Sequence, residues 1–90
     1  MEVTLMKWED VRQAFSEQWV LIEATQAYTT EQSERILEEV SPLNTFSNSP
    51  DAMREYQKIH QEEPFRELYV LHTSRENPNI IEKKWVGVRR

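Results

Sequence analysis

Two stretches of this chain are hydrophobic at almost every consecutive position, and both are rich in residues that favour strands. One is residues 68–71, which lie within the longer segment 66–74. The other is residues 19–24. Hydrophobic residues on both faces are typical of a strand inside a sheet, whereas an edge strand beside water tends to alternate. We therefore predict two interior strands and place the one at 68–71 at the centre of the sheet.

Hydrophobic residues at helical spacing predict a helix near the start of the chain. Trp8, Val11 and Phe15 recur at i, i+3 and i+7, which gives residues 7–16 one hydrophobic face. Residues 1–5 precede this pattern and are interpreted as a loose N-terminal extension.

A second helix is marked at both of its ends. Ser49 is suited to cap it, Pro50 to occupy its first position, and Pro64 to follow its end. We therefore predict a helix over residues 49–62. Its inward stripe is expected to contain Met53, Tyr56 and Ile59 or His60.

Residues 80–88 mix polar and hydrophobic side chains on both alternate faces, which predicts a last strand at the edge of the sheet. This segment also holds Gly87, the only glycine of the chain. Glycine-rich phosphate-binding loops are therefore excluded, and tight turns are expected to use Asn, Asp, Ser or Pro.

Three segments together resemble a family of short uncharacterised bacterial proteins: residues 19–24 (Trp-Val-Leu-Ile-Glu-Ala), 72–76 (His-Thr-Ser-Arg-Glu) and 85–89 (Trp-Val-Gly-Val-Arg). The resemblance covers residues 6–90 and implies no activity. The chain also resembles small domains in which a hydrophobic strand, a second strand, a capped helix and a third strand follow one another.

Residues 25–46 fit two interpretations. A helix can begin near Thr30, with Ile36, Leu37 and Val40 as its hydrophobic face. Alternatively residues 35–46 form a strand that lies at an edge or is broken at Pro42, because proline lacks the backbone N–H. The order of elements in the small domains that the chain resembles favours the strand.

These elements predict one α+β domain over residues 1–90, in the order helix, strand, strand, helix, strand, strand. We expect two layers, with a mixed sheet of three to four strands and two helices. The strand before Ser47, the second helix and the strand at 68–71 would form a right-handed crossover.

The composition narrows the function classes only a little. The chain of 90 residues carries a net charge of −5 and contains no cysteine, which excludes thiolate metal sites and cysteine nucleophiles. No hydrophobic run approaches the roughly 20 residues that a membrane span needs. We expect a cytoplasmic protein without a membrane partner.

One corner of the predicted sheet carries the best candidate for a ligand site. His72, Ser74 and Arg75 follow the strand at 68–71, and Glu23 could reach them from the first strand. Together they would supply a base, a hydroxyl group, an anion-binding guanidinium group and an acid. The more common role of such residues is an ordinary polar hairpin loop, which we favour.

No other group of residues has the spacing of a catalytic or metal site, so we expect no cofactor, no metal and, on balance, no enzyme. Residues 75–90 carry a charge of +3 against −8 for residues 1–74. RNA binding through this basic end remains an alternative, although the acidic whole disfavours nucleic acid.

The sequence therefore predicts a small non-catalytic interaction or regulatory module. A ligand-binding protein or enzyme that uses the His72 corner is the main alternative. The expected partner is another protein or a second copy of the chain, because three tryptophans are hard to bury in so small a domain. The expected contact residues lie on the last strand and are Ile81, Trp85, Val86 and Val88.

Overall fold

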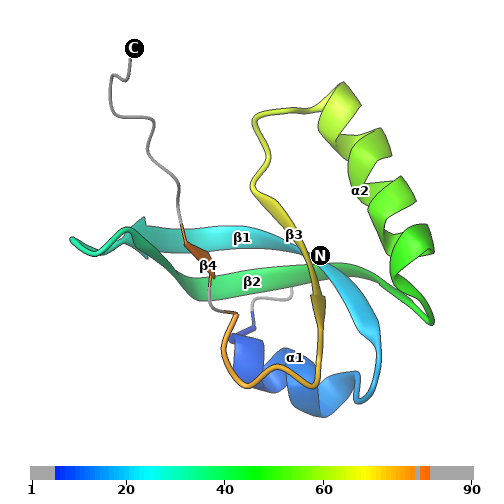
Figure 1. Ribbon diagram of the computed structural model, residues 1–90, viewed down its shortest axis with the longest axis horizontal. Helices are drawn as coiled ribbons and strands as arrows, with labels where there is room; N and C mark the ends of the chain where they lie inside the picture. The colour runs from blue at the N-terminus through cyan, green and yellow to red at the C-terminus, as the bar shows by residue number, and fades with distance from the viewer. Residues whose placement is uncertain (1–5, 79, 82–90) are drawn as a thin grey trace, which may run out of the picture.

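Two helices pack on an antiparallel sheet in the computed structural model, which describes residues 6–78 and 80–81 (Figure 1). The elements in chain order are α1 (Trp8–Ala14), β1 (Trp19–Thr29), β2 (Glu34–Phe46), α2 (Ser49–Glu62), β3 (Leu68–His72) and β4 (Ile80–Ile81). The chain is thus an α+β protein, and the predicted order of helices and strands agrees with the observed one.

The long strands β1 and β2 and the five-residue β3 form the sheet, and the two-residue β4 extends it at one side. The strand order is β3-β1-β2-β4, and each neighbouring pair is antiparallel. The expectation of a mixed sheet was therefore wrong. Because β2 and β3 are both antiparallel to β1, they run in the same direction, and α2 connects them across β1.

The strand predicted at the centre of the sheet, β3, lies at its edge, and β1 takes the interior position. Leu68 and Leu71 of β3 are nevertheless buried, with 6% and 4% of their surfaces exposed. Leu68 and Leu71 point to opposite faces of the sheet. Their burial shows that both faces of the sheet are covered at β3. Burial of side chains does not indicate whether β3 has a neighbouring strand on both of its sides.

The helices cover opposite faces of the sheet, so the predicted two-layer arrangement gives way to helix, sheet and helix (Figure 1). Side chains buried on the α1 side are Trp8, Val11, Val20, Ile22, Val40 and Leu71. Leu21 lies between two of these residues in β1 and therefore points to the other face. It is fully buried there, as is Ala52 of α2.

Residues 34–46 form the long strand β2, which confirms the strand interpretation over the helix. Pro42 lies opposite Ile22, and the register between β1 and β2 shifts next to this pair. The extra residue there is Leu43. A break at the proline is what the missing N–H predicts.

The second helix has the predicted span, but its cap is one residue earlier than expected. The Asn48 side chain accepts a hydrogen bond of 2.9 Å from the backbone N–H of Asp51, so Asn48 is the N-cap and Ser49 is the first helical residue. Ala52 is buried and Met53 is 42% exposed, so Met53 does not belong to the inward stripe. The partly buried Tyr56 and Ile59 do belong to it.

Two turns contain residues other than glycine in the left-handed region. Ser33, in the turn between β1 and β2, has φ 66°, and Glu17, between α1 and β1, has φ 58°. Serine was among the expected turn residues, whereas glutamate was not. Such a backbone conformation costs a residue with a β-carbon about 1 kcal/mol or more.

The predicted last strand is only partly covered by the structure. Ile80 pairs with Arg35 and Ile81 with Glu34, and the remainder of the predicted 80–88 strand lies outside the described residues. Within the described part of the chain, no helix has the length and hydrophobicity to cross a membrane.

Candidate interaction surface

The backbone of β3 faces β1 on one side only. Ala24 donates its N–H to Glu67, and Thr73 donates its N–H to Gln18. In an antiparallel pair, every second residue of a strand bonds to the same neighbour. Residues 67 and 73 bond to β1, so the backbone groups of residues 69 and 71 also face β1. The N–H and C=O groups of residues 68, 70 and 72 therefore point away from β1. We call this side of β3 the outer edge.

The first end of β3 is held by an ion pair that crosses to β1. The Arg66 guanidinium contacts the Glu23 carboxylate at 2.6 Å and 3.2 Å, and each side chain is 25% exposed. The hydrogen bond to Glu23 raises the pKa of Arg66. The arrangement is bidentate, which fixes the orientation of both groups.

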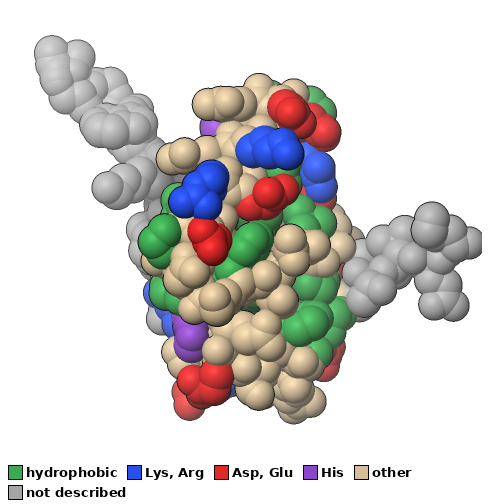
Figure 2. Space-filling model, turned by 90° about the vertical axis from the view of Figure 1, so that its right-hand side faces the viewer, with side chains coloured by type: hydrophobic (Ala, Val, Ile, Leu, Met, Phe, Trp, Pro, Cys, Tyr) green, Lys and Arg blue, Asp and Glu red, His purple; other side chains and the backbone are tan. Residues whose placement is uncertain are grey.

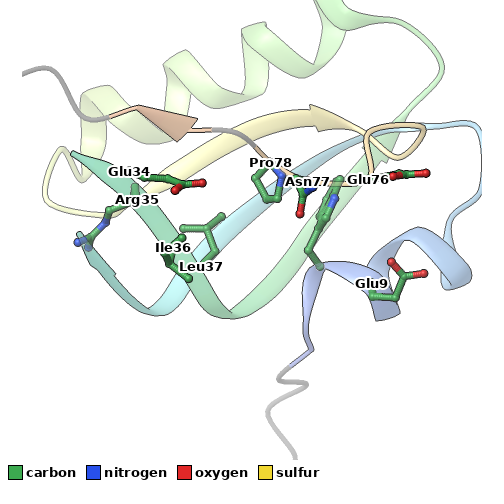
Figure 3. A pocket seen from close by; sticks show the side chains of 9 residues that line it. Glu9, Glu34, Arg35, Ile36, Leu37, Glu76, Asn77 and Pro78 are labelled. Carbon is green, nitrogen blue, oxygen red and sulfur yellow. The ribbon is translucent and has the colours of Figure 1, made fainter. Parts of the chain in front are cut away.

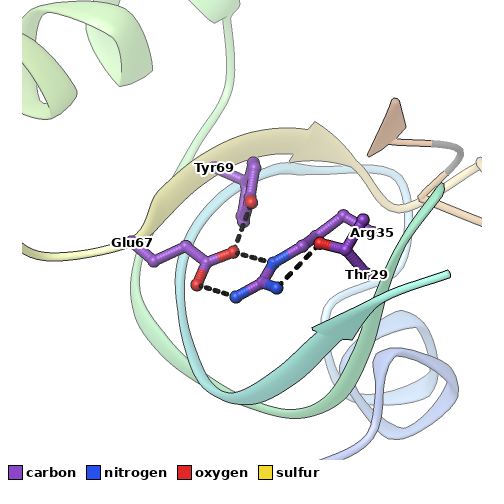
Figure 4. Close-up of polar contacts among 4 residues, drawn as sticks. All are labelled: Thr29, Arg35, Glu67 and Tyr69. Atoms are coloured by element: carbon purple, nitrogen blue, oxygen red, sulfur yellow. Dashed lines mark hydrogen bonds and ion pairs between the residues drawn. The ribbon is translucent and has the colours of Figure 1, made fainter. Parts of the chain in front are cut away.

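A second polar cluster includes Tyr69, which packs against the core on the α1 side of the sheet (Figure 4). Arg35 of β2 donates two hydrogen bonds, at 2.8 Å and 2.9 Å, to the Glu67 carboxylate, and a third at 3.0 Å to Thr29. Tyr69 donates its hydroxyl proton to Glu67. The four side chains join the far end of the β1–β2 hairpin to the start of β3.

The positive charge of Arg35 and the negative charge of Glu67 neutralise each other, and this ion pair shifts the pKa values of both groups. Hydrogen bonding to Glu67 raises the pKa of Arg35, and the Arg35 hydrogen bonds hold the pKa of Glu67 below its ordinary value. Burial, followed by the hydrogen bond to Glu67, raises the pKa of Tyr69. The cluster therefore has the properties of a structural ion pair.

The other end of β3 is fastened to α1 and to the turn before β1. Thr73 is 3% exposed, and its hydroxyl accepts the N–H of Gln18 at 3.1 Å. Its carbonyl accepts a hydrogen bond of 2.9 Å from Arg12 Nε. The Trp8 indole donates to the carbonyl of Arg75 at 2.8 Å. These bonds hold residues 73–75 in place mainly through the backbone.

The predicted ligand residues are only partly brought together. The His72 ring lies edge-on to Trp19, with 5.1 Å between ring centroids, and Nδ1 of His72 lies 2.9 Å from the Ser74 hydroxyl. The Ser74 N–H donates to the same nitrogen. Arg75 follows directly, but Glu23 pairs with Leu68 at the opposite end of β3. An antiparallel β1 carries Glu23 away from the corner, whereas a parallel one would have brought it there.

The outer edge lacks the features that usually protect a sheet edge. Residues 68–72 include no Asp, Glu, Lys, Arg or Pro, and no register shift occurs between β3 and β1. Among the described residues, no backbone group pairs with the outward N–H or C=O of Val70. An edge strand of this kind is a template for another strand.

Phe65 is the most exposed large hydrophobic residue of the described chain, with 82% of its surface accessible. It lies three residues before Leu68, in the connection between α2 and β3. Phe65 was not among the residues predicted from the sequence to form a site or a contact. Its position indicated exposure, because a large aromatic residue stands there in a predicted loop, between Pro64 and Arg66.

Two clefts lie elsewhere on the surface. One, of about 290 Å³, opens between α1, β2 and the connection to β4, and carboxylates of Glu9, Glu34 and Glu76 surround it (Figure 3). The other, of about 310 Å³, lies beside Lys7 and Glu38. Neither is lined by His72, Ser74, Arg75 or Glu23.

Charged side chains give no clear indication of a partner. In Figure 2 acidic, basic and hydrophobic side chains are interspersed over the face in view. Within the described residues, no three acidic or histidine side chains converge as a metal site would require. Of the predicted contact residues, Trp85, Val86 and Val88 lie outside the described residues, and Ile81 is described only by its backbone pairing with Glu34.

No family model, curated protein or solved structure matches the chain. The resemblance based on three sequence segments therefore stays a prediction. Among the described residues, no backbone group pairs with β3 at Val70 on its outer edge, and the exposed Phe65 lies three residues before the start of this strand.

Proposed function

We propose that this chain is a small non-catalytic interaction module that binds a protein partner by strand addition at the outer edge of β3. The observation that carries the proposal is the set of outward backbone groups at Leu68, Val70 and His72, on a strand whose two ends are fixed. A partner strand would gain main-chain hydrogen bonds there, and little reordering of the module would be needed.

The alternative functions have weaker support. A ligand site at His72, Ser74 and Arg75 lacks Glu23 at the same corner, and neither of the two clefts above is lined by these residues. RNA binding through residues 83–90 concerns a segment outside the described residues. The cytoplasmic location and the single-domain organisation remain proposals from the sequence.

The test compares two substitutions at one position of the edge. Val70→Pro removes an N–H that points away from β1, so it should block strand addition and keep the β1–β3 ladder. Val70→Thr changes the same β-branched side chain and keeps the N–H. The full-length chain and both variants serve as baits for proteins of the source organism, and captured proteins are quantified by mass spectrometry.

We expect at least one protein to be captured by the wild type and by Val70→Thr and to be reduced at least tenfold with Val70→Pro. A second copy of the chain counts as such a protein. Circular dichroism shows that each variant is folded. If the captured set does not change with Val70→Pro, the outer edge is not the binding surface and the proposal fails.

A further inference from the structure

We infer that the partner of the outer edge is a second copy of this chain, paired antiparallel through β3 around a two-fold axis at Val70. This inference rests on the proposed function, because it names the partner of the same edge. It replaces the sequence-based expectation of a dimer through residues 80–88 with a different strand.

The backbone geometry selects one register. Outward groups occur at residues 68, 70 and 72, which are spaced symmetrically around Val70. When Val70 faces its own copy, Leu68 of each chain faces His72 of the other, and all three positions are used. A shift by two residues places a residue beyond the end of β3 opposite one of them. The symmetric register therefore forms the most hydrogen bonds.

The side chains are compatible with this register. On the α2 side of the sheet, Val70 would lie opposite Val70 of the other copy, and Leu68 opposite His72. On the α1 side, Tyr69 would lie opposite Leu71. No like charges lie opposite each other. The neighbouring charges of Arg66 and Glu67 are already neutralised within the chain by Glu23 and Arg35.

The same two-fold axis explains the exposed aromatic residue. Phe65 lies three residues before β3 and Arg75 three residues after it, so the axis places the end of β3 that carries Phe65 in one copy beside the end that carries Arg75 in the other. Both side chains are exposed, and Arg75 forms no ion pair with a described residue. A guanidinium group on an aromatic face is a favourable contact.

The opposite side of the sheet is less suitable for self-pairing. Ile80 pairs with Arg35 on the outer side of β2, and Met6 exchanges hydrogen bonds of 2.9 Å and 2.7 Å with Val40 further along. These contacts interrupt the free length of β2. Within the described residues, β3 is the strand that presents an uninterrupted outer edge.

The expected dimer is weak. A stable interface typically buries about 800 Å² per partner, and a five-residue edge with one aromatic contact at each end provides less. We therefore expect a weak dimer that dissociates on dilution, which sedimentation velocity over a micromolar concentration series can follow.

The first experiment uses thiol cross-linking, since the chain has no cysteine of its own. A residue on a two-fold axis lies beside its own copy, so Val70→Cys should be cross-linked to a dimer by a short bismaleimide. Met53→Cys places a thiol at an exposed site on α2 as the control and should stay monomeric. Equal yields for the two variants would contradict the predicted register.

The second experiment exchanges charges at the ends of the interface. Phe65→Arg places a cation against Arg75 of the other copy and should weaken the dimer at least fivefold. Adding Arg75→Glu should restore the affinity, because the new pair is attractive. Met53→Arg is the matched control, with the same charge change on α2, and should leave the dimer unaffected. Both targets are exposed, so folding is preserved.

The outcomes separate this inference from the proposed function. A monomer at 200 μM, together with partner capture that is lost in Val70→Pro, overturns the inference and leaves the module with a different partner. A dimer that is insensitive to Phe65→Arg and is not rescued by Arg75→Glu overturns the inference as well. If capture is also insensitive to Val70→Pro, both proposals fail.

Discussion

At the scale of single residues, the start of α2 shows how one hydrogen bond decides which residue caps a helix. Ser49, Pro50 and Asp51 all suit a first turn, but the Asn48 side chain reaches the N–H of Asp51 and leaves Ser49 inside the helix. Hydrogen bonds from Arg54 and from Asn48 also hold the pKa of Asp51 below its ordinary value. The cap is therefore one residue earlier than the sequence signal suggested.

This shift leads to a paired prediction. Asn48→Ala should lower the free energy of unfolding by about 1 kcal/mol, since it removes the acceptor for the Asp51 N–H. Ser49→Ala should change it by less than about 0.3 kcal/mol, since alanine is a good residue inside a helix. Urea denaturation followed by circular dichroism measures both. A larger loss for Ser49→Ala than for Asn48→Ala would restore Ser49 as the cap.

At the scale of elements, β3 combines buried side chains with an outer edge that pairs with no strand of the described chain. The two helices cover its faces, and hydrogen bonds and ion pairs hold its ends. Its start is fixed by Arg66 with Glu23, and its end by the buried Thr73. Residues 72–75, which include the predicted ligand residues His72, Ser74 and Arg75, thus mainly fasten β3 to α1 and to the turn before β1. Fixed ends keep the outer edge extended.

The fastening can be tested at Thr73. Thr73→Val keeps the shape of the side chain and leaves the Gln18 N–H without its acceptor, so it should cost about 1–2 kcal/mol of unfolding free energy. Ser74→Ala is the control, because the Ser74 hydroxyl is exposed and its hydrogen bond within the described residues is to the His72 ring. We expect a much smaller change there. Equal losses in urea denaturation would show that the Gln18 contact is unimportant.

At the scale of the whole molecule, the polar cluster of Thr29, Arg35, Glu67 and Tyr69 brings distant parts of the sheet together. β1 and β2 have register shifts near Ala24 and Gln26, and the strands curve around the four side chains (Figure 4). The far end of the hairpin can then reach Glu67, which precedes β3. The cluster closes the curved sheet, and its energy depends on the charge of Glu67.

A pH dependence of stability follows from the lowered pKa of Glu67. A carboxylate whose pKa is lower in the folded than in the unfolded chain contributes stability above its unfolded value, and this contribution disappears as the pH falls through the folded value. Glu67→Gln should therefore be less stable than the wild type at pH 7. The difference should shrink below the ordinary glutamate value of about 4.5.

Urea midpoints at pH 7, 5, 4 and 3 measure this difference for the two proteins. Glu62→Gln, on an exposed residue at the end of α2, controls for the loss of one negative charge. A constant gap between wild type and Glu67→Gln at all pH values would show that the Arg35 contact does not depend on ionisation.

The sequence alone determined the elements of this protein and their order along the chain. Helical spacing, a proline near each end of α2 and hydrophobic runs are local signals, because backbone conformation and side-chain period are properties of neighbouring residues. For residues 35–46 the local signals left helix and strand open, and the order of elements in the small domains that the chain resembles favoured the strand, which the structure shows at 34–46. His72, Ser74 and Arg75 were also adjacent in the sequence, so their proximity followed directly.

Only the tertiary structure decided which strand lies inside the sheet, which faces the helices cover and which edge stays open. Hydrophobic residues on both faces of Leu68–His72 are typical of an interior strand, but here they are buried because α1 and α2 cover the two faces of the sheet. Whether a strand lies at an edge depends on pairing of its backbone N–H and C=O groups, and these groups are the same in almost every residue. The antiparallel direction of β1 separated Glu23 from His72 and joined Arg35 to Glu67. Such contacts depend on chain direction and sheet curvature, which no local pattern specifies.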